Sequence, residues 1–395
     1  MRRLGLLALI TAVLAALLVP SAAPVVAAQR NVARGRALRL PTLHVTTQVS
    51  GLNIPWDVRV LPGGRLLIDQ RSKAKLLVWH AGTTRVLSGF ASSSVWTSGE
   101  TGVMGLQVDP SFASNHRVYT CQGGFRPGGG HEVKVVAWAM NDAFTGVKYL
   151  KTLVRGFPTS SGRHGGCRLL IARNGAMLVG TGDAATTSNP QNLRSFGGKT
   201  LRLNRFSGAP WPTNPWPHAK SRVRRYIQTY GHRNVQGLAQ RSDGSLWSIE
   251  QGTFRDDEVN KLVNGGNYGW QPGPGYDESP PMTNYALPGR QIGAKWSSGN
   301  PTLATSGGTF VYGSQWGDLN GTLAVAALKT QQVIFMKFDK NGKLLWTRRP
   351  AALKSFGRLR SITEDTHGDL LITTSNATDD SQTNDVVLRV HPTLS

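Results

Sequence analysis

The sequence predicts an all-β fold, and within that class a six-bladed β-propeller. Helical periodicity is nearly absent after the N-terminal segment, and short runs rich in Val, Leu, Ile, Thr, Tyr and Trp alternate with Gly, Asn and Asp turns. One pattern, a turn residue followed by a small or polar residue and an apolar strand, recurs at 63–68, 115–119, 174–179, 243–247, 320–325 and 367–372. The copies are roughly 45 to 80 residues apart, which suits one four-stranded blade plus a variable loop. Isolated hairpins would use the same turns, but the regular repetition favours a propeller over a sandwich or an irregular barrel.

The N-terminal segment has the composition of a secretory signal peptide. Residues 1–28 contain a basic pair, an apolar run from Leu4 to Leu18 and a small-residue site at Val26–Ala28. The apolar run is short for a membrane span, and no later run is longer. We therefore expect an exported chain without a transmembrane segment, located outside the cell, in a periplasm or at the cell surface. Because no Pro/Ser/Thr-rich linker divides residues 29–395, they are expected to form one propeller domain with a short basic N-terminal extension.

The chain is strongly basic, with a formal net charge of +23. Such a balance favours an anionic neighbour, for example a surface polymer of the cell wall. The basic residues are spread along the chain, with clusters only at Arg30–Arg39 and Arg222–Arg225, and spread charge is more typical of a solvated face than of a binding site. No nucleic-acid-binding module is recognisable, so nucleic acid is not an expected partner.

The chain has two cysteines, Cys121 and Cys167. An oxidising compartment permits a disulfide between them. The sequence leaves open whether their Cα atoms come within bonding distance. If they do, the bridge would tether the neighbouring loop that carries His164.

The segment from Arg163 to Asp183 is the first candidate for chemistry. It places His164 on a glycine-rich approach to a strand and Asp183 just past the next strand. Glycine lets the backbone approach a ligand closely, so His164 would be a base presented on a loop rather than buried in a core. The alternative is a surface histidine and a turn aspartate.

Two further segments carry candidate carboxylates. Glu100 lies between glycines at the head of an apolar strand, where it either faces a pocket or belongs to a turn. The segment Glu250–Asn260 packs four carboxylates and a glycine turn into a short stretch. This oxygen-rich composition suits Ca²⁺, although it lacks EF-hand spacing and could equally be a solvated acidic turn.

A cationic pair precedes the sixth repeat. Arg358 and Arg360 alternate with Leu359, so on a strand they share one face and could bind carboxylates. A charged edge strand is the alternative. Lys329 follows the fifth repeat strand.

Together, these motifs resemble the soluble, calcium- and pyrroloquinoline-quinone (PQQ)-dependent glucose and aldose sugar dehydrogenases, with their sorbosone dehydrogenase relatives. The resemblance extends over nearly the whole chain after the signal, from Ile54–Asp57 to Arg358–Arg360. The motifs that carry it are Gly99–Gly102, His164–Gly166, Thr181–Asp183, Gly198–Asn204, Gly231–Leu238 and Asn267–Trp270. The family fold is a six-bladed propeller, in agreement with the repeats.

The resemblance implies a role for each matching residue. His164 would be the general base that takes the proton from the anomeric hydroxyl of an aldose while hydride passes to the quinone, and Asp183 would orient it. Arg233 and Asn234 would hold the reacting quinone oxygens, and Glu100 would face the pocket.

The remaining implied contacts are to the cofactor and its metal. Lys329, Arg358 and Arg360 would bind the cofactor carboxylates. Gly252 and Thr253 would offer backbone carbonyls to a calcium ion that polarises the quinone. The family commonly has His-Gly-Pro where this chain reads Gln251-Gly252-Thr253.

The sequence thus predicts an exported quinoprotein that oxidises a small sugar and passes electrons to an external acceptor. One alternative is a non-catalytic propeller that binds an anionic glycan or cell-wall polymer through its basic surface. Another is a calcium-dependent hydrolase of the lactonase type, against which Arg358 and Arg360 at the pocket argue.

Overall fold

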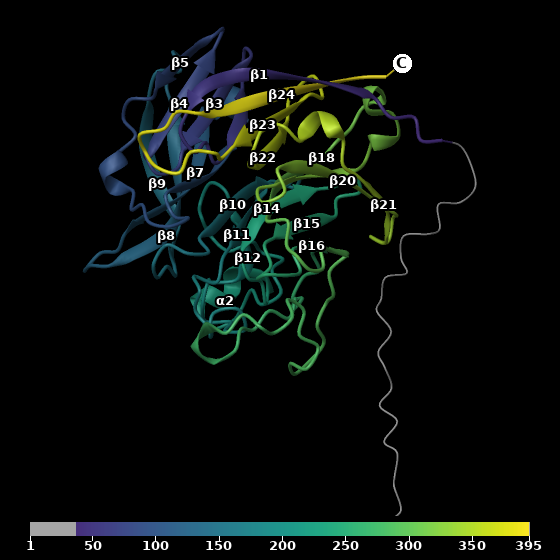
Figure 1. The fold of residues 1–395 in the computed structure, drawn as a ribbon. Helices are drawn as coiled ribbons and strands as arrows, with labels where there is room; N and C mark the ends of the chain where they lie inside the picture. Colours follow the sequence, from purple (N-terminus) through teal and green to yellow (C-terminus); the bar gives the residue numbers. More distant parts are fainter. Residues whose placement is uncertain (1–36, 395) are drawn as a thin grey trace, which may run out of the picture. The chain divides into compact units, whose positions relative to one another are not determined.

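The computed structural model describes residues 37–394 and consists almost entirely of β-strands. The strands form six four-stranded antiparallel sheets, the six blades of a β-propeller (Figure 1). The all-β, six-bladed prediction is therefore confirmed. The predicted signal peptide at 1–28 and most of the basic extension lie outside the described residues. Among residues 37–394, none of the helices has the length and apolar character that a membrane crossing requires.

The first three blades follow one another along the chain. Blade 1 consists of β2 (Val58–Leu61), β3 (Arg65–Gln70), β4 (Lys75–His80) and β5 (Thr83–Val86). Blade 2 consists of β6 (Val103–Val108), β7 (Arg117–Phe125), β8 (His131–Met140) and β9 (Val147–Phe157). Blade 3 consists of β10 (Gly166–Ile171), β11 (Ala176–Thr181), β12 (Lys199–Asn204) and β13 (Ile227–Tyr230).

Blades 4 and 5 are also built from consecutive strands, whereas blade 6 takes its outermost strand from the start of the domain. Blade 4 consists of β14 (Val235–Gln240), β15 (Leu246–Glu250), β16 (Glu258–Lys261) and β17 (Trp296–Ser297). Blade 5 consists of β18 (Thr305–Phe310), β19 (Leu323–Ala327), β20 (Gln332–Phe338) and β21 (Leu344–Arg348). Blade 6 consists of β22 (Leu359–Glu364), β23 (Leu370–Thr374), β24 (Asp385–Thr393) and β1 (Thr42–Leu52).

The first strand of the domain supplies the outermost strand of the last blade. β1 pairs antiparallel with β24, from Thr42 opposite Thr393 to Leu52 opposite Asp385. The two strands lie side by side in Figure 1. The ring is therefore closed by backbone hydrogen bonds between the two ends of the propeller.

The six sequence repeats are the second strands of the six blades: β3, β7, β11, β15, β19 and β23. The turn before each strand explains the repeated pattern. Gly64, Gly175, Gly244 and Gly368 have φ values of 71°, 86°, 88° and 81°. This left-handed conformation is accessible to glycine at little cost, so the same turn residue recurs.

The hydrophobic core lies between adjacent blades. Trp247 of blade 4, for example, packs against Phe310 and Phe338 of blade 5, with ring centroids 5.8 and 4.7 Å away. The first strands of neighbouring blades contact one another around the ring, so β2, β6, β10, β14, β18 and β22 surround a central channel.

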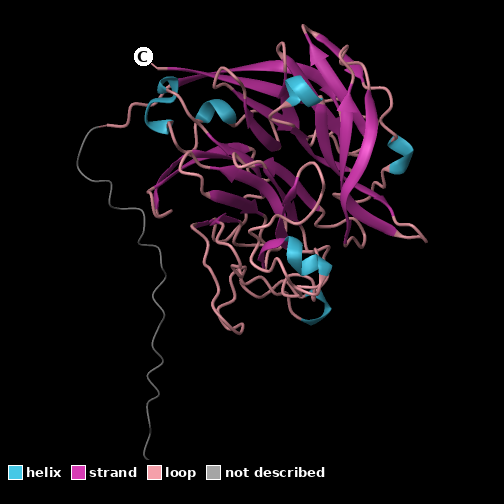
Figure 2. Ribbon diagram, turned by 180° about the vertical axis from the view of Figure 1, so that it is seen from behind, coloured by secondary structure: helices cyan, strands magenta, loops and turns pink. Residues whose placement is uncertain are grey.

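Among the described residues, helices are confined to short segments of three to six residues within connections (Figure 2). They are α1 (Phe112–Asn115), α2 (Arg222–Tyr226), η1 (Ser92–Ser94), η2 (Pro274–Tyr276), η3 (Ser314–Leu319) and η4 (Ala351–Leu353). Three long connections, 182–198, 205–226 and 262–295, gather beside blades 3 and 4 (Figure 1). They supply much of the site described below.

Candidate active site

His164 and Asp183 form a hydrogen-bonded pair. His164 lies in the connection before β10, and its Nδ1 is 2.8 Å from Asp183 Oδ1. The expected loop position of His164 is confirmed, but its expected exposure is wrong, because only 3% of the residue is accessible and Asp183 is fully buried. The loop is covered by the connection 262–295, which the sequence pattern did not predict.

The Asp183 carboxylate is held by several donors. Its Oδ2 accepts hydrogen bonds from Trp270 Nε1 at 2.8 Å and from the Tyr276 hydroxyl at 2.7 Å. Its Oδ1 also accepts from the backbone N–H of Ala185 at 2.8 Å. This network assigns the Nδ1 proton of His164 to the bond with Asp183 and leaves the Nε2 lone pair as the basic position.

Tyr276 belongs to the site although no sequence motif pointed to it. Its hydroxyl is 2.9 Å from His164 Nδ1 as well as bonded to Asp183. Burial, together with the negative charge of Asp183, raises the pKa of Tyr276 far above its ordinary value, so the hydroxyl remains a donor. Trp270 lies in the aromatic turn that the sequence did single out, whereas Tyr276 follows only a Pro-Gly turn, which gives no such signal.

Arg233 and Asn234 lie next to the pair. The backbone carbonyl of Arg233 accepts a hydrogen bond from the Asp183 N–H at 2.8 Å. Asn234 Nδ2 donates to Glu100 Oε2 at 3.0 Å, and Asn234 Oδ1 accepts from Gly166 N at 3.2 Å. The structure thus brings together residues from blades 2, 3 and 4.

The guanidinium of Arg233 has a carboxylate partner that the sequence analysis missed. Arg233 Nη2 and Nε donate to Glu278 Oε1 at 2.6 and 3.1 Å. Glu278 also pairs with Arg163 at 2.7 Å. Burial alone would raise the pKa of Glu278, but Arg233 and Arg163 outweigh burial and lower that pKa, so the carboxylate stays charged.

A cavity of about 320 Å³ beside Glu100 is lined by Arg358, Arg360 and a third arginine, Arg71. The Arg360 guanidinium lies 3.5 Å from the centroid of the Trp56 ring. Burial and the charges of Arg71 and Arg358 lower the pKa of Arg360, which Glu100 only partly offsets.

Three cations thus face one carboxylate in this cavity. The Nε atoms of Arg71 and Arg360 are buried and have no hydrogen-bond partner within residues 37–394. Such a set fits a ligand that carries several carboxylates. Lys329 is exposed and is not one of the residues that line the cavity, so its predicted contact stays a prediction.

The four carboxylates of Glu250–Asn260 do not converge on a metal position. Asp257 accepts hydrogen bonds from the N–H groups of Gly252 at 3.0 Å and Leu303 at 2.6 Å, so it organises the backbone. Among the described residues, no group of three or more His, Cys, Asp or Glu side chains could hold a metal ion. The carbonyl oxygens of Gly252 and Thr253 accept no hydrogen bond from the described part of the chain and remain available as ligands.

The two cysteines form a disulfide that joins β7 of blade 2 to β10 of blade 3. The Cα atoms of Cys121 and Cys167 are 5.4 Å apart. Cys167 is three residues after His164, so the bridge fixes the start of β10, to which the histidine loop leads. The sequence left open whether the Cα atoms of the two cysteines come within bonding distance, and the structure shows that they do.

Comparison with known proteins identifies relatives over most of the chain. A sequence model of the family described as Glucose / Sorbosone dehydrogenase matches residues 52–383. Aldose sugar dehydrogenase YliI of Escherichia coli is 27% identical over 348 residues, which cover 84% of this chain and 92% of that protein. Quinoprotein glucose dehydrogenase B of Acinetobacter calcoaceticus is 27% identical over 294 residues, which cover 65% of this chain and 60% of that protein. The PQQ-bound aldose sugar dehydrogenase of Streptomyces coelicolor superposes with a TM-score of 0.72 at 26% identity, covering 89% of this chain and all of that one.

Proposed function

Because the chain belongs to the glucose/sorbosone dehydrogenase family, we propose that it oxidises an aldose sugar at the anomeric carbon with PQQ as the hydride acceptor. The observation that carries the proposal is the His164–Asp183 pair, 2.8 Å apart. Asn234 links the histidine loop, through Gly166, to Glu100, which lines a cavity together with three arginines. A base held by a carboxylate suits removal of a hydroxyl proton. The arginines suit a cofactor that carries carboxylates.

The quinone would supply a two-electron acceptor for the hydride that leaves the anomeric carbon. We propose that Arg358, Arg360 and Arg71 hold its carboxylates, with Lys329 as a further contact. Arg71 was not expected from the sequence, but it lines the same cavity, and its buried Nε has no hydrogen-bond partner in the described part of the chain.

We propose that His164 Nε2 accepts the proton of the anomeric hydroxyl. The Asp183 carboxylate accepts a hydrogen bond from His164 Nδ1–H and stabilises the imidazolium that forms when Nε2 takes up the proton. Trp270 and Tyr276 donate to the same carboxylate and hold it in place. The oxidised product is a lactone, the proton leaves through His164, and an external acceptor removes the electrons.

Asn234 and Arg233 are proposed to bind the reacting quinone oxygens. Glu100 accepts a hydrogen bond from the Asn234 amide and so fixes its direction. Glu278 holds the Arg233 guanidinium in the same way. Both carboxylates therefore position donors rather than react.

Calcium assistance is proposed only through the carbonyl oxygens of Gly252 and Thr253. Carbonyl oxygen is a ligand that Ca²⁺ accepts. The neighbouring carboxylates already accept hydrogen bonds from backbone N–H groups or side chains, so the protein alone would supply few ligands and the ion would be bound together with the cofactor. Export of the chain also remains a proposal and rests on residues 1–28.

Reconstitution tests the proposal. The protein with added PQQ and Ca²⁺ should reduce an artificial dye in the presence of an aldose, and His164→Ala should abolish the activity while PQQ still binds. His218→Ala is the matched control, because His218 is exposed. Absence of both dye reduction over a broad panel of sugars and quinone binding would refute the proposal.

The net charge of +23 favours a second candidate, a propeller that binds an anionic glycan or cell-wall polymer. This binding would weaken with salt, because exposed charges are screened, and it would survive His164→Ala. Sedimentation with an anionic polysaccharide at low and high salt separates the two candidates.

A further inference from the structure

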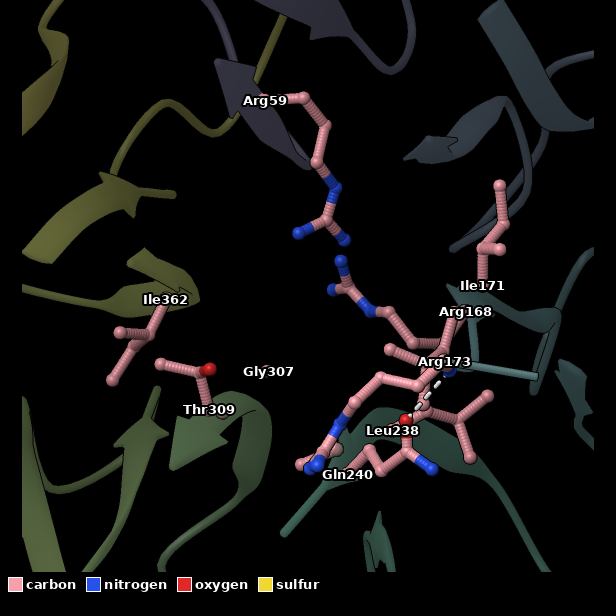
Figure 3. Close-up of a pocket in the computed structure, with 12 residues that line it drawn as sticks. Arg59, Arg168, Ile171, Arg173, Leu238, Gln240, Gly307, Thr309 and Ile362 are labelled. Atoms are coloured by element: carbon pink, nitrogen blue, oxygen red, sulfur yellow. Dashed lines mark hydrogen bonds between the residues drawn. The ribbon is translucent and has the colours of Figure 1, made fainter. Parts of the chain in front are cut away.

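A second cavity in the central channel has no part in the proposed reaction. It has a volume of about 220 Å³ and is lined by residues of the inner strands, with Leu170, Leu238 and Ile362 among its apolar walls. Figure 3 shows the guanidinium groups of Arg59 and Arg168 pointing toward one another into this space. No residue lines both this cavity and the one beside Glu100.

Arg59 and Arg168 share a single carboxylate oxygen. Arg59 Nη2 is 2.9 Å and Arg168 Nη1 is 2.7 Å from Asp57 Oδ2. Arg168 and Asp57 are buried, so solvent screens these charges little. Two cations at one anion leave an excess of one positive charge.

The nearby Asp69 does not remove this excess. Burial and the charge of Asp57 raise the pKa of Asp69 well above its ordinary value, which favours the neutral form of its carboxyl. Guanidinium groups, in contrast, keep their proton in proteins. Two guanidinium groups, those of Arg59 and Arg168, thus share the one charge of Asp57.

One buried donor at this position has no partner. Arg168 is 3% exposed, its Nε donates to the Gln236 carbonyl at 2.8 Å, and its Nη2 bonds to nothing within the described residues. An unpaired buried donor on a charged group costs free energy unless a ligand or water satisfies it. The hydroxyl of Thr309 lies across the cavity (Figure 3), and the one hydrogen bond that it makes within residues 37–394 is a long one, 3.4 Å, to the Phe310 carbonyl.

We propose that this cavity binds a small inorganic anion between Arg168 and Arg59, with Thr309 as a hydroxyl donor. A water molecule occupies roughly 30 Å³ of liquid volume, so the space accommodates a halide or a tetrahedral oxyanion with a few waters. The anion neutralises the excess charge and occupies the free Nη2 donor.

Anion-dependent stability measures this binding. The protein without added cofactor is unfolded with urea in sodium gluconate, and the gluconate is replaced stepwise by bromide or sulfate at constant ionic strength. The resistance to urea should rise and saturate for at least one of the two ions. Crystals grown in bromide should show an anomalous peak within hydrogen-bond distance of Arg168 Nη2.

Three variants assign the effect to the cavity. Arg168→Gln removes the free donor and should weaken anion binding at least tenfold. Arg168→Gln also leaves Asp57 with only one guanidinium partner, Arg59. Leu238→Phe is therefore used to fill the cavity without changing any charge, and it should abolish the saturable gain in urea resistance. Thr309→Val should weaken binding severalfold. Arg290→Gln is the matched control, since it removes one exposed arginine elsewhere and should leave the gain unchanged.

The proposal would be overturned if the anions increased the urea resistance of wild type and of Leu238→Phe equally, or if the bromide peaks lay outside the cavity. If Arg290→Gln reduces the gain in urea resistance as much as Arg168→Gln does, the effect comes from surface charge, and the proposal is again overturned. The assay uses neither quinone nor sugar, so its outcome is independent of the proposed dehydrogenase activity.

Discussion

At the scale of single residues, the Tyr276 hydroxyl makes the environment of His164 more constrained than a simple histidine–aspartate pair. The hydroxyl lies 2.9 Å from His164 Nδ1 and 2.7 Å from Asp183 Oδ2. It therefore limits rotation of both the ring and the carboxylate. Tyr276 acts through His164 and is a positioning residue.

Tyr276→Phe should lower kcat and leave KM nearly unchanged. A hydrogen bond to a charged group contributes roughly 1.5–3 kcal/mol, so kcat should fall about ten- to a hundredfold if the whole contribution is lost in the transition state. Steady-state kinetics with saturating PQQ measure the change. Tyr285→Phe is the control on the same connection, because Tyr285 is 69% exposed. A rise in KM with constant kcat would show that Tyr276 binds substrate instead.

Asp69 gives the channel a measurable pH dependence. Its pKa is raised by burial and by Asp57, whereas in the unfolded chain the carboxyl ionises near pH 4. The folded state therefore binds more protons than the unfolded state above about pH 4. The stability that the protonated carboxyl contributes is fully present below that pH and is lost progressively as the pH rises through the pKa of the folded state.

Asp69→Asn should remove this dependence. The amide oxygen can still accept the hydrogen bonds from Trp56 N and Asp57 N, at 2.8 and 2.7 Å. Relative to wild type, the free energy of unfolding of the variant should increase with pH above about pH 4, by at most about 1.4 kcal/mol per pH unit. Urea unfolding at several pH values between acid and neutral measures this difference. A difference that does not vary with pH would mean that Asp69 is ionised in the folded protein.

At the scale of elements, the repeated second strands could be predicted because their signal is local. A glycine or asparagine turn and the apolar strand after it are adjacent in sequence, as at Asn174–Val179 and β11. The inner strands carry no comparable pattern. Residues 305–310, which form β18, read Thr-Ser-Gly-Gly-Thr-Phe, and their strand character depends on packing against neighbouring blades.

The candidate site was predictable where a motif carried it and not where tertiary folding did. His164 and Asp183 are close in sequence and were paired correctly. Tyr276 and Glu278 come from the connection 262–295, which folds over His164 from a position more than a hundred residues later in the chain. The carboxylates of Glu250–Asn260 show the opposite case, because their composition suits a metal ion but does not reveal that Asp257 is used for backbone hydrogen bonds.

The disulfide between β7 and β10 should matter to both stability and activity. It closes a sequence separation of 46 residues, for which removal typically costs roughly 2–4 kcal/mol. The double change of Cys121 and Cys167 to alanine should therefore reduce the urea midpoint. It should also lower kcat more than it raises KM, because the strand that follows His164 loses its tether. A variant with reduced stability but unchanged kcat would show that the bridge has no role in placing His164.

At the scale of the whole molecule, the ring depends on one pair of strands that are distant in sequence. β1 and β24 join the two ends of the propeller, and no covalent bond supports this junction. Contacts between residues so far apart close a long loop, which costs chain entropy on folding. Separation of β1 from β24 is therefore expected to be an early step in unfolding.

A covalent bond across this junction should slow unfolding. Thr42 and Thr393 are directly opposite in the register, and both are exposed, so Thr42→Cys with Thr393→Cys places two thiols on facing positions of an antiparallel pair. Such pairs have Cα atoms about 4.5–5.5 Å apart, within the range that a disulfide spans. Because the bridge would close nearly the whole propeller into one loop, its stabilisation could reach about 5 kcal/mol in the chain-entropy model. Urea unfolding rates of the oxidised double variant should fall well below those of each single variant. Equal rates would mean that the ring opens first between other blades, and the strand pair β1–β24 would then not be its weakest junction.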